Sequence, residues 1–210
     1  MVTLQISTHL WMIWLRIAFE HEFSADGARE NLGSLDRSDP AFSLALEAEM
    51  YASLVGVSAA AHAIDALYGE IRVHIPIPDR LAATWEKNRT SRPGRIFETL
   101  KTGCTLGSRG GTWPQDLKWL YGLRDAAVHH QVEASEGSPH PSGTTHVGKE
   151  MAIYTVEATH TAIDLALDVV VVAVGSPRPE MTALREWADG MSHVPPYLIE
   201  ERGRRRATAS

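Results

Sequence analysis

An arginine, an aspartate and two adjacent histidines stand close together in the chain, at Arg124, Asp125, His129 and His130. An arginine guanidinium can stabilise the negative charge that develops on a phosphate while it is transferred. One histidine can take the proton of a ribose 2′-hydroxyl, and a second can protonate the leaving 5′-oxygen. Because the 2′-hydroxyl is itself the nucleophile, this set would cleave RNA, spare DNA and need no metal ion.

A single helix, at residues 112–131, is predicted to carry all four side chains. Asp125 and His129 are four residues apart, so they can touch on its polar face, and Asp125 can orient His129. Arg124 lies off that face on an apolar stripe, where it must pair, extend to water, or face a cleft or subunit interface. On an ideal helix Arg124 and His129 point about 140° apart. They can meet at one phosphate only if the helix ends or kinks, or if a second subunit supplies one of them.

A structural role is the alternative for the same residues. Arg124 can form a salt bridge to Asp65 or Glu47 of an earlier long helix. The two histidines can instead cap the carbonyl groups at the end of their own helix.

The segment Leu-Tyr-Gly-Leu-Arg-Asp-Ala-Ala-Val-His-His, residues 120–130, resembles the signature of the HEPN superfamily. That signature is an arginine, a polar residue, a few mostly apolar residues and then a histidine. The polar residue is usually Asn in the family, and here it is Asp125. The earlier helix that carries Tyr51, Asp65 and Tyr68 also resembles the helix that packs against the motif. The resemblance covers about residues 40–175.

The resemblance implies an all-α bundle of about five to six helices. It implies a homodimer in which the two motifs meet across the interface. Members are often toxins of toxin–antitoxin pairs or phage-defence ribonucleases, so an antitoxin or defence-system protein is an expected partner. We therefore expect a metal-independent endoribonuclease that leaves a cyclic phosphate. In this enzyme Arg124 stabilises the phosphate and His129 acts as a general acid or base. His130 is the candidate for the second acid or base. The alternative is a catalytically inactive module that binds a partner protein, RNA or a nucleotide.

Charge is distributed unevenly along the chain. The formal net charge of −6 argues against a general nucleic-acid coat protein. Residues 87–109 nevertheless carry six cationic side chains against Glu98 alone, a local charge of +5. This segment is predicted either to contact RNA or to be an ordinary solvated surface. The residues predicted to bind substrate are Arg89, Arg92, Arg95, Lys101 and Arg109.

The spacing of apolar residues predicts a single α-helical domain over residues 1–175, with the HEPN-like core at about 40–175. A first helix, at residues 8–22, packs on that core or faces a partner. The residues between 24 and 40 are predicted to form a connector, those between 133 and 148 a polar loop, and residues 176–210 a C-terminal extension that ends in an unstructured basic tail. The remaining helices are predicted at residues 40–73, 80–88, 92–102, 149–174 and 181–190.

Composition limits the class of protein further. Hydrophobic residues make up 44% of the chain, enough for a real core. Cys104 is the single cysteine, which excludes a disulfide framework and a cysteine-based zinc site. We expect no cofactor, no metal and a reducing cytoplasm as the location. The apolar runs at residues 9–19 and 162–175 are judged too short to cross a bilayer, so no membrane partner is expected.

Overall fold

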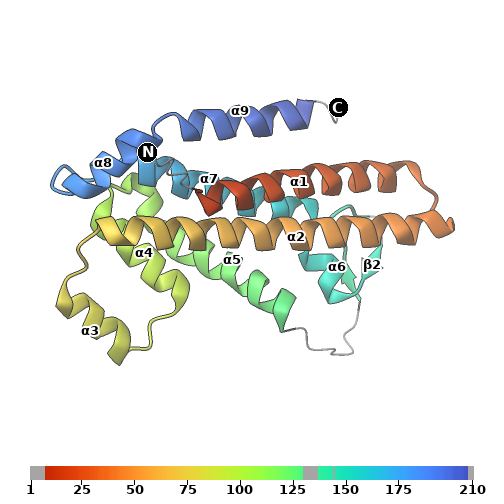
Figure 1. Cartoon of the computed structure of the whole chain (residues 1–210). Coiled ribbons are helices and arrows are strands. Elements are labelled where there is room, and N and C mark those ends of the chain that lie inside the picture. Colours follow the sequence, from red (N-terminus) through yellow and green to blue (C-terminus); the bar gives the residue numbers. More distant parts are fainter. Residues whose placement is uncertain (1–7, 130–136, 144, 208–210) are drawn as a thin grey trace, which may run out of the picture.

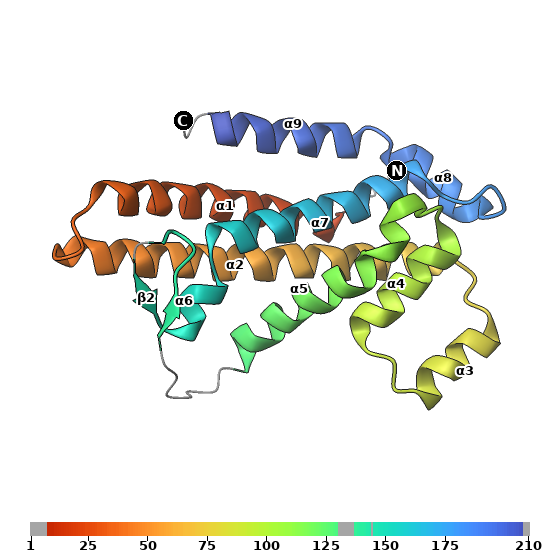
Figure 2. The same cartoon turned by 180° about the vertical axis from the view of Figure 1, so that it is seen from behind.

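The computed structural model describes residues 8–129, 137–143 and 145–207. Within these ranges the chain is a bundle of α-helices with a single two-stranded hairpin, so the predicted all-α class is confirmed. Two long helices, α1 (Leu10–Ser34) and α2 (Pro40–Ile71), run side by side along the molecule. A third, α7 (Val156–Gly175), packs on both, as the views from the front and from behind show (Figures 1 and 2).

Helix α2 lies at the centre of the bundle. Local sequence sets its start: the Asp39 carboxylate accepts a hydrogen bond of 2.8 Å from the amide of Ala41, and Pro40 takes the first helical position. Its middle is lined with small buried residues, which lets its neighbours come close. A Cβ placed on Gly56 would lie 2.7 Å from Cγ2 of Thr159 in α7. The small residues therefore let α7 come close to α2 at this point.

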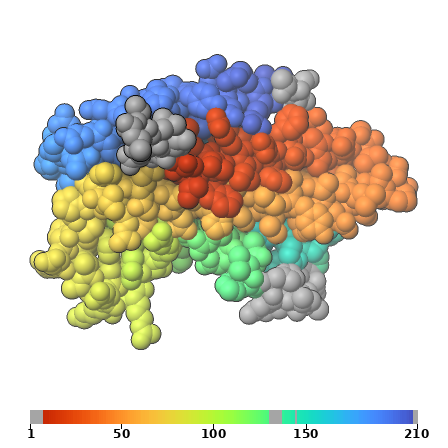
Figure 3. All heavy atoms as spheres, in the orientation of Figure 1, coloured from red at the N-terminus to blue at the C-terminus, as the bar shows by residue number. Residues whose placement is uncertain are grey.

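The helices α3 (Asp79–Lys87), α4 (Arg92–Gly103) and α5 (Trp113–Val128) form one side of the molecule, below α2 in Figure 1. The hairpin of β1 (Ser138–Pro139) and β2 (His146–Val147) and the short α6 (Lys149–Ile153) follow them. The other side carries α8 (Thr182–Met191) and α9 (Val194–Ala207). In the space-filling view the part that contains α3 projects from the lower left and is separated from α5 by an indentation (Figure 3).

The first helix is longer than predicted, and the connector expected between residues 24 and 40 is wrong. Helix α1 continues to Ser34 because Ala25, Ala28 and Leu32 extend its buried face along the bundle. This packing outweighs the low helix propensity of Gly27 and Gly33.

The basic tail is not unstructured, which corrects a second prediction. Arg202 of α9 is buried and points at the buried Glu22 of α1, with 2.8 Å between Nε and Oε2. Its Nη1 donates a further hydrogen bond to Asp164 of α7. The extension predicted after residue 175 therefore packs back on the bundle, and α9 follows the direction of α1 (Figure 1).

The helix predicted at residues 149–174 is divided in two. Tyr154 and Thr155 separate α6 from α7, and the hydroxyl of Thr155 accepts a hydrogen bond of 3.3 Å from the amide of Ala158 at the start of α7. Tyr154 is buried, and its hydroxyl donates to the carbonyl of Leu123 in α5 at 2.7 Å. The break thus attaches this part of the chain to the helix that carries Arg124. The polar loop predicted before it contains the hairpin, and residues 130–136 and 144 lie outside the described residues.

Two of the described helices, α2 and α7, are long and apolar enough to cross a membrane. The run at residues 162–175 is part of α7, which has 20 residues and is longer than the run itself. Of the most apolar window of each helix, 56% in α2 and 67% in α7 is buried inside the bundle. Core helices of this kind pass the same test of length and composition, so the test does not decide whether either helix meets a bilayer.

Candidate functional site

Helix α5 turns Arg124 toward α2. Trp113, Leu117 and Leu120 form the buried stripe of α5, and Arg124 continues this stripe one turn later. Its Nη1 donates a hydrogen bond of 2.8 Å to Oδ2 of Asp65. The salt bridge to Asp65 that the sequence offered as an alternative is therefore formed, while 21% of the Arg124 side chain stays exposed.

Asp65 joins two of the predicted site residues. Its other oxygen, Oδ1, accepts a hydrogen bond of 2.6 Å from Nε of Arg92, the first residue of α4. Each guanidinium also lies over a tyrosine ring, Arg92 over Tyr68 at 4.3 Å and Arg124 over Tyr121 at 4.5 Å. The guanidinium groups of Arg92 and Arg124 are thus held in place. Each contacts a tyrosine ring, and both bind the carboxylate of Asp65.

Tyr121 adds a buried polar group beneath Arg124. Its hydroxyl is buried and has no hydrogen-bonding partner among residues 8–129, 137–143 and 145–207. Burial raises the pKa of Tyr121 well above its usual value, and the charge of Asp65 raises it further. The hydroxyl therefore keeps its proton at neutral pH and remains a hydrogen-bond donor.

A cleft of about 430 Å³ opens beside Arg124, between α4 and α5. Arg92 and Lys118 line it together with Arg124, Asp125 adds one carboxylate, and Phe97 and Tyr121 supply apolar and aromatic surface. Cations around an open, partly apolar cavity are suited to a phosphate group that carries an organic substituent.

The histidine end of the motif is arranged differently from the prediction. Helix α5 ends at Val128, and His129 leaves the helix with φ −111° and ψ 49°. Its side chain is exposed. The carboxylate of Asp125 accepts 2.7 Å and 3.1 Å hydrogen bonds from Arg124, and in the described part of the chain no side-chain hydrogen bond joins it to His129. The predicted contact between Asp125 and His129 is therefore not formed, because Arg124 engages the carboxylate. His130 lies outside the described residues.

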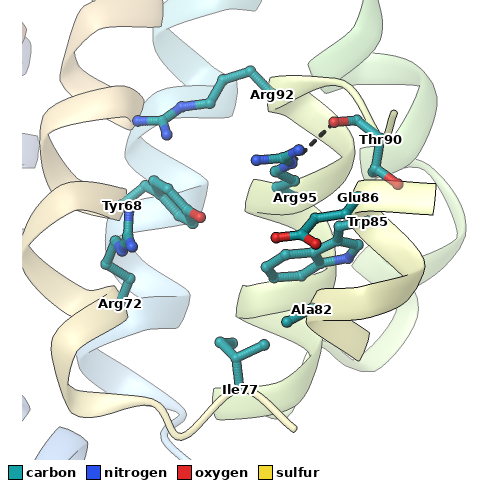
Figure 4. Close-up of a pocket in the computed structure, with 9 residues that line it drawn as sticks. All are labelled: Tyr68, Arg72, Ile77, Ala82, Trp85, Glu86, Thr90, Arg92 and Arg95. Carbon is teal, nitrogen blue, oxygen red and sulfur yellow. Dashed lines mark hydrogen bonds between the residues drawn. The ribbon is translucent and has the colours of Figure 1, made fainter. Parts of the chain in front are cut away.

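The residues predicted to bind substrate do not form one surface. Arg92 and Arg95 line a second cleft, of about 360 Å³, between α2, α3 and α4 (Figure 4). Arg89 is exposed in the turn between α3 and α4, with a φ of 48°. Lys101 is exposed with its Nζ 3.8 Å from Glu98. Arg109 forms two hydrogen bonds, of 2.7 Å and 2.9 Å, with the carboxylate of Asp168 in α7, and this pairing engages it on another part of the bundle.

Comparisons with models of known protein families, with curated proteins and with solved structures give no match.

Several residues that line the clefts were not predicted from the sequence, among them three charged residues and a tryptophan. Lys118 lies beside Arg124, while Arg72, Trp85 and Glu86 line the second cleft. Arg72 has a local signal, because it follows Tyr68 by one helical turn and its guanidinium lies 5.8 Å from the centre of that ring. Trp85 and Glu86 give no such signal, since they line a cleft only because of the position that α3 takes relative to α2.

The described residues contain no group of three or more His, Cys, Asp or Glu side chains placed to hold a metal ion.

Proposed function

We propose that the protein is a metal-independent endoribonuclease whose site contains Arg124 and His129. One observation carries the proposal. The guanidinium of Arg124 is fixed by Asp65 yet stays partly exposed at an open cationic cleft, and the chain leaves the helix at His129, five residues further on. The end of the helix supports the proposal because a continuous helix would direct the two side chains apart.

The proposed reaction is an attack of the ribose 2′-oxygen on the adjacent phosphorus. One imidazole, of His129 or His130, takes the proton of the 2′-hydroxyl as the new P–O bond forms. A second imidazole gives a proton to the 5′-oxygen as its bond to phosphorus breaks, and the product is a 2′,3′-cyclic phosphate. Arg124 stabilises the negative charge on the phosphate oxygens. Lys118, on the same cleft, adds positive charge for the neighbouring phosphate.

A homodimer would supply the second imidazole, as the resemblance to HEPN proteins implies. The proposal includes a cytoplasmic location and a partner that restrains the nuclease, such as an antitoxin or a defence-system protein. The apolar residues Leu10 and Ile13 of α1, exposed at 57% and 44%, are a candidate surface for such a partner.

A second candidate function is a module that binds without cleaving. The observation in its favour is that two carboxylates, Asp65 and Asp125, already pair with Arg124. An arginine held in this way can serve structure or bind an anion without assisting any reaction.

A cleavage assay in EDTA distinguishes the two functions. Wild type, Arg124→Ala and His129→Ala are incubated with total RNA and a panel of tRNAs, and the products are tested for 2′,3′-cyclic phosphate ends. His193→Ala is the matched control, because His193 is an exposed histidine in the turn between α8 and α9. Thermal unfolding of each variant shows whether it is folded.

We expect wild type and His193→Ala to cleave, and a loss of at least about 100-fold in both site variants. Cleavage by folded His129→Ala at the wild-type rate would refute the proposed role of His129. Absence of cleavage by wild type, together with tight binding of RNA or a protein, would favour the second function.

A further inference from the structure

The second cleft has the size and the lining of a small-molecule site. Its volume of about 360 Å³ falls within the range of cavities that hold small ligands. Figure 4 shows how three helices form its walls. Tyr68 comes from α2, Arg72 from the 3-10 turn Arg72–His74 that directly follows α2, Trp85 and Glu86 from α3, and Arg95 from α4.

Two of its arginines lack a carboxylate partner. Among the described residues, no Asp or Glu oxygen lies within 4 Å of the guanidinium nitrogens of Arg72 or Arg95. Nε of Arg95 donates a 3.0 Å hydrogen bond to the carbonyl of Thr90, which orients the guanidinium and leaves its terminal nitrogens available. The fork of an arginine guanidinium is well suited to a phosphate group, since its N–H donors match the phosphate oxygens. Each of the two arginines is therefore suited to an anion, Arg72 on the α2 side of the cleft and Arg95 on the α4 side (Figure 4).

Trp85 gives the cleft a flat aromatic surface. Its ring is half-buried and points from α3 toward Tyr68 across the cleft (Figure 4). The main chain that carries this ring is fixed, because the amide of Thr90 donates to the Trp85 carbonyl at 2.9 Å between α3 and α4. Stacking on an aromatic side chain is a common way to bind a nucleobase, and it tolerates any base.

Glu86 places a carboxylate in the same cleft. In the parts of the chain that the structure describes, this carboxylate forms no ion pair. It would repel a bare anion such as inorganic phosphate. The ligand that fits must therefore combine an anionic group with N–H donors. A carboxylate accepts two hydrogen bonds side by side, and guanine presents two adjacent donors, N1–H and the 2-amino group. Adenine and uracil would place an acceptor beside their donor, against the negative oxygens.

We propose that this cleft binds a guanine nucleotide. The base stacks on Trp85, its N1–H and 2-amino groups donate to Glu86, and the phosphate pairs with Arg72 on the opposite side of the cleft. The nucleotide can be a free mononucleotide or one residue of a single-stranded RNA, because both present the same groups. The inference goes beyond the cleavage proposal, since it requires neither Arg124 nor His129.

Isothermal titration calorimetry of the full chain with GMP, AMP and inorganic phosphate tests the proposal. We expect GMP to bind about tenfold more tightly than AMP, the usual effect of one two-bond contact to a base edge. Phosphate alone should bind at least about tenfold more weakly than GMP. Glu86→Gln should bring GMP to within about threefold of AMP. Arg72→Gln should weaken GMP but leave the affinity for guanosine, which has no phosphate, unchanged.

Arg80→Gln is the matched control. Arg80 is an exposed arginine of the same helix as Trp85 and Glu86, and it does not line the cleft. Its replacement should leave every affinity unchanged. The tryptophan fluorescence of the protein should fall on GMP binding, and Trp85→Phe should abolish that change.

A hexamer of 2′-O-methyl RNA, made of adenines with one guanine, shows whether the bound guanine belongs to RNA or to a free nucleotide. The methyl groups prevent cleavage through the 2′-oxygen. If it binds more tightly than GMP, the natural ligand is RNA. If GMP binds at least as tightly, the ligand is the free nucleotide. The proposal is overturned if GMP shows no binding at millimolar concentration, if GMP and AMP bind equally, or if Glu86→Gln keeps the preference for guanine. His129→Ala should keep the wild-type GMP affinity, so failure of the cleavage proposal and failure of this one are separate results.

Discussion

Alanine at one glycine of α2 should lower the stability of the protein, and alanine at another glycine of the same helix should raise it. Gly56 faces α7, where an added Cβ would lie 2.7 Å from Cγ2 of Thr159, closer than real carbon atoms approach. Thr159 cannot easily move away. It is fully buried, it is β-branched, and its hydroxyl donates to the carbonyl of Thr155 at 3.0 Å. Gly69 is exposed on the same helix, and an added Cβ there would meet nothing within 4 Å.

The magnitudes follow from two opposing effects. Alanine in place of a helical glycine gains about 1 kcal/mol, because the unfolded chain loses less entropy on folding. In Gly69→Ala no clash opposes this gain, so that variant should be more stable than wild type by about 0.5–1 kcal/mol. Gly56→Ala has the same gain, but overpacking of a rigid core costs about 1–3 kcal/mol, and the upper part of that range applies to so short a contact. We expect it to be less stable by about 1–2 kcal/mol.

Urea unfolding, followed by circular dichroism, measures both free energies, and thermal unfolding gives a second readout. For a chain of this length, 1 kcal/mol corresponds to a shift of about 2–4 °C. The midpoints of the two variants should therefore lie on opposite sides of the wild type. If Gly56→Ala is as stable as Gly69→Ala, then α1, α2 and α7 do not approach as closely as described, and the reasoning fails.

Two further predictions concern charged groups. Arg202→Met should destabilise the protein by about 3–5 kcal/mol in urea unfolding, because Glu22 is left charged and buried, and the double variant Arg202→Met/Glu22→Met should recover most of the loss. A double variant as unstable as the single one would contradict this. Burial alone would raise the pKa of Glu157, but hydrogen bonds from Arg29 lower it from the ordinary 4.5 to about 2. The stabilising contribution of Glu157 is therefore complete above about pH 4.5 and is lost as the pH falls toward 2. Glu157→Gln should make the thermal midpoint less dependent on pH in that range, and an unchanged dependence would count against the assignment.

The parts of the fold that local sequence determines were predicted well. Helix α2 has a capping aspartate, a proline at its first position and a regular apolar face, and each acts within a few residues. The end of α1 and the whole of α9 were not predicted, because their stability comes from distant partners. Nothing near Arg202 in the sequence indicates that Glu22 would bury it.

In the functional site, too, some features could be predicted from local sequence and others depend on distant residues. The pairing of Arg124 with Asp65 could be anticipated, since both lie on helices with clear apolar faces. Arg109 was grouped with Arg92 because the two are near in sequence, but Asp168 binds it elsewhere. The cleft at Trp85 could not be foreseen, because its shape depends on how α3 docks, which is a matter of long-range packing.

The contact between Glu22 and Arg202 also sets an order of events during synthesis. The two residues are 180 positions apart, so at about 5–20 residues per second a ribosome adds Arg202 about 10–40 seconds after Glu22. During that interval the carboxylate of Glu22 has no guanidinium of Arg202 to pair with it, and burying it unpaired would be costly. The ion pair that joins the first helix to the last can therefore form only after almost the whole chain has been made. Until then the growing chain exposes apolar surface of α1 and α2, the kind of surface that chaperones bind.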